Sequence, residues 1–556
     1  MDTTYTTEQI QITLPSREVH NVEVGTRVGT LLNEKQNGYP VIAAMVNNRI
    51  TSLSYRVDVH ARVTPVALDS PEGLRVYRRS LCFLLAIASK KLYPDRRMTI
   101  GHSLGDGYYY TFEDSDGITE EEEQALEQEM RRLVEADLPI ERKLISYEDA
   151  LEHFRTHWMT DTALLLENRN DHKVAIYQCG DFIDLAHDPL APRTGALRWF
   201  QVLRYRSGFL LRHPRDHAPM EIQPFEDIPV LFSIYQEYKQ WGRILGVNSA
   251  GRLNTLSRRN GIRDFIWTAE ALHSKKISDI SDRIHEHLES VRTVLIAGPS
   301  SSGKTTFTKK LAIQLKATGL RPVTINLDDY FVPRDQTPLD EHGKPDFEAL
   351  EAIDVDLLND DLVALLSGEE VNLPTFDFRT GERTYENKFA SLPERGIIVM
   401  EGIHGLNEAL TPRLPSESKF KIYVSALTQL NLDDHTRVST TDNRLIRRLV
   451  RDAHFRARGA KGTLEMWPNV RRGEDRNIFP YQGKAHVAFN SALDYELGVL
   501  KPYAEPLLRE VKPYDSVYHE AVRLMDFLDN FTAIPSSTVP DQSILREFIG
   551  DSAFRY

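Results

Sequence analysis

Gly298-Pro299-Ser300-Ser301-Ser302-Gly303-Lys304-Thr305 matches the pattern G-x-x-x-x-G-K-[ST] and lies between an apolar run, Val294 to Ala297, and a stretch with helical apolar spacing, Thr306 to Leu315. Its glycines let backbone N–H groups turn toward phosphate oxygens, and the start of a helix adds partial positive charge. Lys304 can reach the β- and γ-phosphates, and the Thr305 hydroxyl can ligate Mg²⁺. The stretch therefore predicts a site for ATP with Mg²⁺. The residues expected to hold the triphosphate here are Gly298, Ser300, Ser301, Ser302, Gly303, Lys304, Thr305 and Thr306.

Acidic residues follow the ends of two further predicted strands. Asp328, with Asp329 beside it, comes after Val323 to Leu327, and Glu401 comes after Gly396 to Met400. A carboxylate at a strand end beside a phosphate loop is placed to accept a proton from a substrate hydroxyl. The second strand-end carboxylate is placed to support Mg²⁺, directly or through water. Each acidic residue alone is typical of a turn, but together, at this spacing, they favour a phosphotransferase.

Arginines recur along one predicted helix. Arg444, Arg447, Arg448 and Arg451 have the spacing i, i+3, i+4 and i+7, so they share one helical face. Such a face is often simply solvated, and it can also line a nucleic-acid groove, although this stretch lacks interleaved aromatic residues. In a phosphotransferase it is typical of a lid that closes over the triphosphate and stabilises developing charge.

The segment from about Val294 to Leu508 resembles the uridine kinase/phosphoribulokinase family of P-loop kinases. The resemblance implies that Asp328 is the general base and that Thr305 and Glu401 serve the metal. It also implies that the lid arginines contact phosphates. The stretches that carry it, in the family's order, are the phosphate loop, Leu327 to Phe331, Met400 to Ile403, and Arg444 to Asp452. The residues it implies in catalysis are Lys304, Asp328 and Arg447, and those it adds to the ATP site are Arg444, Arg448 and Arg451.

The same resemblance extends to the acceptor. Leu373 to Phe378 is similar to the family's P-x-Y-D-F segment, and Asp354 to the aspartate of its P-D-A-F-D stretch. The family's pyrimidine-reading Tyr and nearby His correspond here to Phe376 and Gly381. Because these two residues cannot pair the polar edge of uracil, we expect a nucleoside acceptor without a strict preference for uridine. The residues implied in acceptor binding are Asp354, Phe376, Asp377 and Arg444.

The N-terminal half carries a second resemblance. Alternating strands such as Ile10 to Leu14 make residues 1–70 similar to the TGS domain, a small β-grasp module. Residues 71–225 resemble the second, editing domain of threonyl-tRNA synthetase. In those enzymes the domain has an H-x-x-x-H pair and a later C-x-x-x-H pair. The corresponding residues here are Arg79 and Phe83 for the first pair, and Ile183 and His187 for the second. One remaining imidazole cannot hold a metal, so we expect the editing chemistry to be lost.

Composition bounds the class of protein. The chain has 556 residues, 41% of them hydrophobic, and a net charge of −13, which disfavours a protein that coats nucleic acid. Two cysteines, Cys82 and Cys179, exclude a disulfide scaffold. The N-terminus lacks a signal-peptide pattern, and the longest apolar run, Leu81 to Ile87, is too short to cross a membrane. The sequence therefore predicts a cytoplasmic protein without a membrane partner.

These observations predict a multidomain protein of mixed α/β and α+β class. We expect a TGS-like β-grasp domain over 1–70, a degenerate editing-like α+β domain over 71–225 and a helical connector over 226–290. A P-loop kinase domain with a parallel sheet over 291–508 and a helical tail over 509–556 complete the chain.

The expected activity is transfer of phosphate from ATP to the 5′-hydroxyl of a nucleoside. Two alternatives stay open. One is another small hydroxyl acceptor on the same core. The other is a nucleotide-gated regulator that binds RNA or tRNA through the N-terminal half, although the sequence lacks the N-K-x-D guanine signature of regulatory GTPases. RNA contact by the N-terminal half and assembly into a homo-oligomer belong to the same set of expectations.

Overall fold

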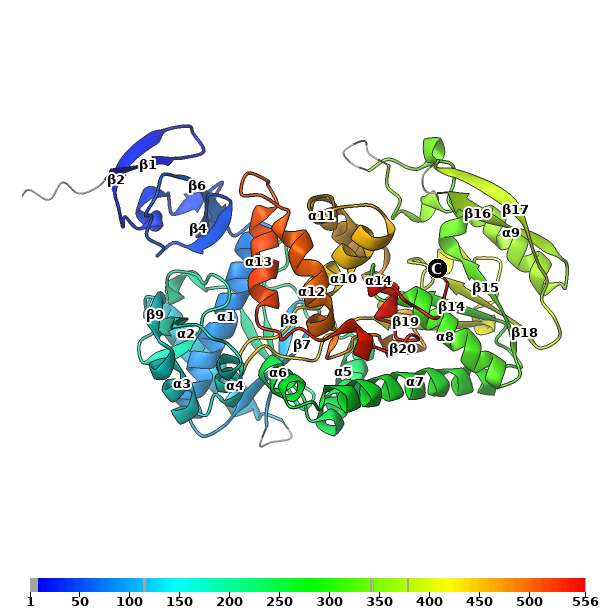
Figure 1. Cartoon of the computed structure of the whole chain (residues 1–556), viewed down its shortest axis with the longest axis horizontal. Coiled ribbons are helices and arrows are strands. Elements are labelled where there is room, and N and C mark those ends of the chain that lie inside the picture. The colour runs from blue at the N-terminus through cyan, green and yellow to red at the C-terminus, as the bar shows by residue number, and fades with distance from the viewer. Residues whose placement is uncertain (1–8, 114–116, 341–342, 344, 378–379, 556) are drawn as a thin grey trace, which may run out of the picture.

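The computed structural model describes residues 9–113, 117–340, 343, 345–377 and 380–555. Figure 1 shows the N-terminal half at the left and the phosphate-loop sheet at the right, with α7 running along the lower edge toward that sheet and α10, α12 and α13 between the two parts. The multidomain α/β class predicted from the sequence is confirmed. Among the described residues, no helix combines the length and apolar character that a membrane crossing requires.

The first unit is a small mixed sheet with strand order β2-β1-β6-β4-β3, in which β5 pairs with β4. The pairing of β1 with β6 is parallel, and the other pairings are antiparallel. Asn47 and Asn48 both have positive φ, which is the conformation that a two-residue hairpin turn between β4 and β5 requires. The strands are β1 (Gln9–Thr13), β2 (Val19–Glu23), β3 (Lys35–Gln36), β4 (Tyr39–Val46), β5 (Arg49–Ser52) and β6 (Ala61–Ala67).

The second unit packs helices against two antiparallel sheets, β12-β13-β8-β7 and β11-β10-β9. The apolar run Leu81 to Ile87 lies within α1, where its side chains are buried in the core of this unit. The helices are α1 (Pro71–Leu92), α2 (Glu120–Glu135), α3 (Tyr147–Thr156) and α4 (Thr160–Glu167). The strands are β7 (Met98–Leu104), β8 (Gly107–Phe112), β9 (Glu141–Ser146), β10 (Lys173–Cys179), β11 (Phe182–Leu185), β12 (Gln201–Tyr205) and β13 (Gly208–Arg212).

Three helices connect this unit to the phosphate-loop sheet. Gly246, in the left-handed conformation, ends the first of them, and a Ser249 side chain caps the second. They are α5 (Pro229–Leu245), α6 (Ala250–Arg258) and α7 (Ile262–Glu286).

The last unit is built on a five-stranded sheet of order β15-β18-β14-β19-β20, in which every pairing is parallel. Because β14 is central and fully buried, the loop that follows it emerges at the carboxyl edge of the sheet, where α/β folds place their ligands. The sheet strands are β14 (Thr293–Ala297), β15 (Arg321–Asn326), β18 (Gly396–Glu401), β19 (Lys419–Ser425) and β20 (Val487–Asn490). A separate antiparallel hairpin consists of β16 (Val371–Asp377) and β17 (Glu382–Ala390).

The end of the chain returns to the sheet. The predicted tail packs against α10 and α12, and its last helix begins at Arg546. The helices of this unit are α8 (Lys304–Ala317), α9 (Val355–Leu366), α10 (Thr440–Phe455), α11 (Ala460–Asn477), α12 (Glu496–Arg509), α13 (Tyr518–Leu528) and α14 (Arg546–Ile549).

Candidate functional site

The phosphate loop joins β14 to the N-terminus of α8. Gly298 lies against the carbonyl oxygen of Val424, so a side chain at that position would collide with the neighbouring strand. Gly303 has φ of 78° and immediately precedes the first residue of α8. These two positions require glycine for different reasons, one for space and one for conformation. The result is a loop whose backbone turns tightly around the start of a helix, as an anion site requires.

The predicted metal residues meet at this loop. The Thr305 hydroxyl donates to Glu401 Oε1 at 2.8 Å, joining the first turn of α8 to the end of β18. Burial raises the pKa of Glu401 to about 7, while the Lys304 ammonium opposes that rise. A hydroxyl and a carboxylate side by side are the oxygen donors that Mg²⁺ prefers, so these residues fit the ion that the sequence predicts.

We expect the metal dependence to be linked to pH through Glu401. The raised pKa means that this side chain takes up a proton as the pH falls through about 7, and a protonated carboxyl is a poor Mg²⁺ ligand. At subsaturating Mg²⁺, kcat/KM for ATP should therefore fall below about pH 7, and more Mg²⁺ should move the inflection to lower pH. A pH–rate profile at two Mg²⁺ concentrations measures this.

Glu348 supplies the matched control. Burial and the neighbouring Glu474 raise its pKa to about 7 as well. Glu348→Gln should keep the Mg²⁺-dependent inflection, whereas Glu401→Gln should remove it. An inflection that ignores Mg²⁺, or that disappears only in Glu348→Gln, would contradict the assignment of Glu401 to the metal.

Lys304 and Asp328 occupy the same edge of the sheet. The Lys304 ammonium donates to the carbonyl oxygens of Gly298 and Pro299, at 2.9 and 3.3 Å, so it is held over the loop that it would serve. Asp328 lies in a 3₁₀ turn directly after β15, where its N–H donates to Asn326 Oδ1 at 3.2 Å. Burial raises the pKa of Asp328, and Lys304 is the strongest opposing charge. The charge of Lys304 therefore favours the ionised form of the candidate base.

Two glutamates that the sequence did not predict lie on the loop. Glu474 of α11 accepts from the Ser300 N–H at 3.0 Å, and Glu547 of α14 accepts from the Thr306 N–H at 3.1 Å and its hydroxyl at 2.7 Å. These amides are ready-made anion donors, and carboxylates occupy them. Glu474 had a weak signal, because it follows Arg471 and Arg472, but nothing in the local sequence around Glu547 marks it.

The lid arginines also converge on the loop. Arg444 donates to the Ser300 carbonyl at 2.9 Å and pairs with Glu474, and Arg448 donates to the Ser300 hydroxyl at 2.7 Å. Arg444 and Arg448 are both buried, so the solvated basic face considered among the alternatives is not what the structure shows.

The other two arginines have different partners. Arg447 is fully buried, where it pairs with Glu496 at 2.5 Å and donates to the Ser491 carbonyl at 2.9 Å. It reaches the loop only through the Ser301 carbonyl at 3.3 Å. Arg451 contacts Asp452 of its own helix at 3.2 Å. The guanidinium of Arg447, which the sequence predicts to act in catalysis, is therefore already engaged in a buried ion pair.

Three of the acceptor residues predicted from the sequence, Asp354, Phe376 and Asp377, lie in or against the β16–β17 hairpin, whereas the fourth, Arg444, lies at the phosphate loop. Asp354 caps α9 by accepting from the Leu357 N–H at 3.1 Å, and its other oxygen pairs with Arg383 at 2.9 Å. Phe376 is buried and packs edge-on against Phe331. Asp377 accepts from the Gly381 N–H at 2.7 Å through its backbone carbonyl.

Two further charged residues of this hairpin, Arg383 and Lys388, lie at the site without a motif in the sequence. Lys388 lies 3.6 Å from Asp329, which also accepts weakly from the Phe376 N–H at 3.4 Å. Arg383 and Lys388 had no motif to mark them, since their pairing with Asp354 and Asp329 depends on how the hairpin folds over the strand ends. Phe378, part of the quoted segment, lies outside the described residues.

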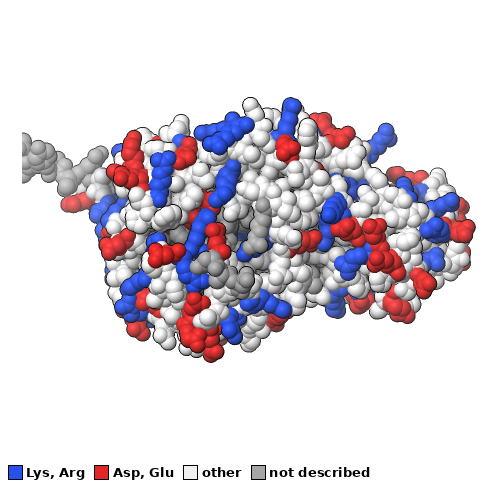
Figure 2. Space-filling model, turned by 90° about the horizontal axis from the view of Figure 1, so that it is seen from below, with Lys and Arg blue, Asp and Glu red and all other residues white. Residues whose placement is uncertain are grey.

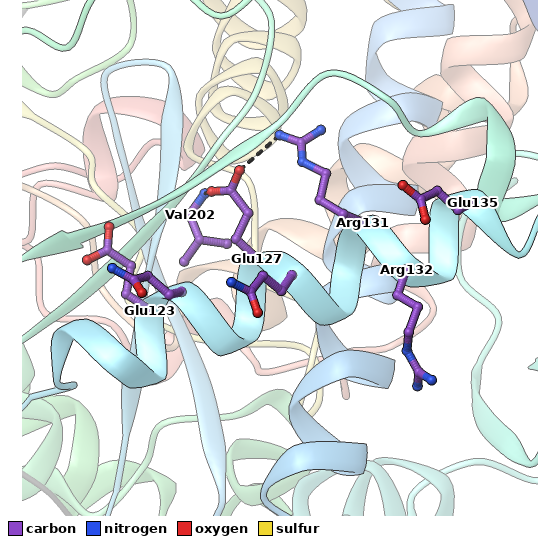
Figure 3. Close-up of a pocket in the computed structure, with 8 residues that line it drawn as sticks. Glu123, Glu127, Arg131, Arg132, Glu135 and Val202 are labelled. Carbon is purple, nitrogen blue, oxygen red and sulfur yellow. Dashed lines mark hydrogen bonds and ion pairs between the residues drawn. The ribbon is translucent and has the colours of Figure 1, made fainter.

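A surface hollow in the N-terminal half is chemically different from this site. Figure 3 shows it along α2, where Glu127 and Arg131 form an ion pair of 3.0 Å beside Val202 of β12. Its lining is almost entirely charged and polar, and it contains none of the residues predicted for phosphate transfer. The phosphate loop therefore remains the candidate site.

Comparison with known proteins finds different relatives for two parts of the chain. Residues 293–497 match the model of the Phosphoribulokinase / Uridine kinase family. A "Possible Uridine Kinase" from Bacillus stearothermophilus is 19% identical, with a TM-score of 0.22, over 38% of this chain and 100% of that one. D-glycerate 3-kinase from Cryptococcus neoformans is 14% identical, with a TM-score of 0.22, over 46% of this chain and 87% of that one.

The N-terminal region is similar to threonine–tRNA ligases. The ligase of Desulforamulus reducens is 34% identical over 197 residues, which are 35% of this chain and 31% of the relative. The ligase of Rubrobacter xylanophilus is 35% identical over 180 residues, which are 32% of this chain and 27% of the relative. The chain thus spans about a third of the length of these curated relatives. One segment of the chain matches the model of the Phosphoribulokinase / Uridine kinase family, and another region is similar to part of the threonine–tRNA ligases.

Proposed function

We propose that the protein transfers the γ-phosphate of ATP to the 5′-hydroxyl of a nucleoside. The observation that carries the proposal is the convergence of Lys304, Asp328 and the Thr305–Glu401 pair at the carboxyl edge of one parallel sheet. Mg²⁺ bound there would neutralise charge on the phosphates. The family match of residues 293–497 supports a kinase that acts on a small molecule.

Each residue of the site has a separate role in the proposed reaction. Asp328 takes the proton of the acceptor hydroxyl, whose oxygen attacks the γ-phosphorus while the bond to the ADP oxygen breaks. Lys304 leaves the loop carbonyls to contact the β- and γ-phosphates, and Arg444 and Arg448 supply further positive charge from α10. Asp354, which pairs with Arg383, is proposed to hold the ribose hydroxyls.

The acceptor is tested by comparing kcat/KM for uridine, cytidine, adenosine, guanosine and inosine. With Phe376 and Gly381 in place of polar side chains, we expect the values to differ by no more than the ~10–200-fold that apolar contact supports. A preference for uridine above about a thousandfold would show that other residues read the pyrimidine. Turnover of a sugar or sugar phosphate in place of every nucleoside would favour the other hydroxyl acceptors.

We expect the tail to weaken ATP binding through Glu547. Its carboxylate occupies the Thr306 N–H, so it competes with a phosphate oxygen and repels it. Glu547→Gln should tighten ATP binding about two- to fivefold, because a charge at a helix N-terminus is worth about 0.3–1 kcal/mol. Calorimetric titration with ATP measures this, with Glu510→Gln, an exposed glutamate at the end of α12, as the control. Weaker binding in Glu547→Gln would mean that Glu547 is part of the ATP site.

We also propose a cytoplasmic location for the protein and a contact between its N-terminal half and RNA. A cytoplasmic location is in keeping with the free thiols of Cys82 and Cys179, both buried. RNA contact by the N-terminal half is suggested by its similarity to the ligases. The face shown in Figure 2 carries interspersed acidic and basic side chains rather than a continuous basic surface, so any RNA contact there would be local.

A further inference from the structure

Residues 427–439, here called the anchor segment, connect β19 to α10 by way of the N-terminal half. The amide of Asn431 donates to the Ile100 carbonyl of β7 at 2.9 Å, and the Gln429 amide contacts His102 of the same strand at 2.6 Å. The Ala250 N–H at the start of α6 donates to the Asn431 carbonyl at 2.8 Å. The anchor segment therefore reaches out of the kinase segment and binds another unit of the chain before the lid helix begins.

Two buried carboxylates form the tip of the anchor segment. Asp433, whose side chain is fully buried, lies 2.6 Å from His187 Nε2 and accepts from the Thr436 N–H at 2.7 Å. Asp434 pairs with Arg97 at 2.8 Å and accepts from both the N–H and the hydroxyl of Thr162 at 2.9 Å. Buried carboxylates are costly unless they are paired, so the tip is stable only where the N-terminal half supplies these partners.

Other groups of the N-terminal half complete this contact. Arg79 of α1 donates to the Thr436 hydroxyl, and His435 pairs with Asp184 of β11 at 3.0 Å. Arg79 and His187 stand where the sequence comparison placed metal-type residues of an editing domain. In this chain the two side chains bind the anchor segment, so the tip occupies the place at which a ligand of that domain would be expected.

A second connection ties α10 to the same half. Asp442 in the first turn of α10 accepts two hydrogen bonds from Arg523 of α13, at 2.7 and 2.8 Å. Glu520 lies 2.6 Å from Arg523 and 2.9 Å from Arg75 of α1. Charge therefore alternates from α1 through α13 to the N-terminus of α10, and Figure 1 shows α13 and α10 between the two halves.

The helix held in this way carries the arginines of the candidate site. Ser439, the last residue of the anchor segment, caps α10, and Arg444 and Arg448 lie one and two turns further on, against Ser300 of the phosphate loop. Since a helix is rigid over so few turns, fixing its first turn fixes where these guanidinium groups point.

We propose that the N-terminal half is a platform that positions α10 over the phosphate loop, with Asp433 and Asp434 as the positioning residues that connect them. The inference rests on the proposed phosphate transfer for its kinetic consequence, but not for the physical coupling. In this proposal the ligase-like region supports the kinase reaction, because its side chains bind the anchor segment of the same chain.

The test uses the full chain with the double variant Asp433→Asn/Asp434→Asn, which keeps size and removes both charges. We expect kcat to fall about 10²-fold, because a misplacement of about 1 Å far from the chemistry can have that effect. Hydrogen exchange in residues 440–455 should quicken at the same time. Glu113→Gln is the matched control, since Glu113 also pairs with Arg97, at 3.2 Å, but is exposed and, among the contacts of the described residues, has none with the anchor segment.

A purely structural role would lower Tm and leave kcat per folded molecule unchanged, so kcat is measured well below the Tm of each variant. If the double variant does not fold, Arg75→Gln is used instead, because Arg75 lies at a partly exposed end of the second connection. We expect it to lower kcat and to quicken exchange in α10 by less than the double variant would. Unchanged kcat and unchanged exchange in α10 would overturn the proposal. If the wild type transferred no phosphate, the proposed function would fail, while exchange in α10 would still decide the coupling.

Discussion

Lys304→Ala is expected to reduce phosphate transfer from ATP by at least ~10²–10³-fold, the loss seen when one preorganised stabilising group is removed from a transition state. The ammonium now held by the Gly298 and Pro299 carbonyls is the positive charge that the loop itself presents to the β- and γ-phosphates. Steady-state turnover with saturating acceptor measures the effect. The fold should persist, because the lysine side chain makes its hydrogen bonds only to its own loop among the contacts described.

Lys316→Ala is the matched control for this variant. Lys316 lies exposed in the last turn of the same helix, α8, and carries the same charge. Its turnover should equal that of the wild type. Near-wild-type turnover in Lys304→Ala would mean that the loop does not hold the reacting phosphates, and the kinase proposal would fail with it.

Asp328→Asn should lower kcat by ~10²–10⁴-fold, the range that general-base catalysis contributes. The amide keeps the size of the carboxyl and removes the proton acceptor, while the 3₁₀ turn is still held by the Asn326 side chain. ATP binding should survive, and for that reason kcat and the dissociation constant of ATP are both measured.

Asp329→Asn separates this role from that of the neighbouring acid. Asp329 already faces Lys388 and the Phe376 N–H, so we expect its loss to change the acceptor KM more than kcat. If Asp328→Asn had full kcat and Asp329→Asn did not, the base would have to be reassigned to Asp329.

The sequence was sufficient for the parts of the site that depend on local spacing. The phosphate loop lies between a buried strand and a helix, both recognisable from a few consecutive residues. Thr305 and Glu401 meet although 96 positions separate them, because parallel strands deliver their carboxyl ends to one edge. Asp328 follows from the same rule, since β15 lies beside β18 in the sheet.

Long-range contacts could not be predicted in the same way. Helical spacing showed that Arg444 and Arg447 share a face, but not that Arg447 pairs with Glu496 across the interior. Glu547 reaches Thr306 over 241 positions, and no local pattern encodes such a contact. The anchor segment depends on side chains such as Arg97 and His187 that carry no kinase motif, so its role appears only when the two halves are seen together.

Identifying the product tests most directly whether the chain phosphorylates a nucleoside. The purified chain is incubated with ATP, Mg²⁺ and each nucleoside in turn, and ³¹P NMR follows the transferred phosphate. We expect a nucleoside 5′-monophosphate formed in equal amount to ADP, in the wild type and Lys316→Ala but not in Lys304→Ala. ADP formation that no nucleoside stimulates, with no phosphorylated nucleoside detected, would contradict it.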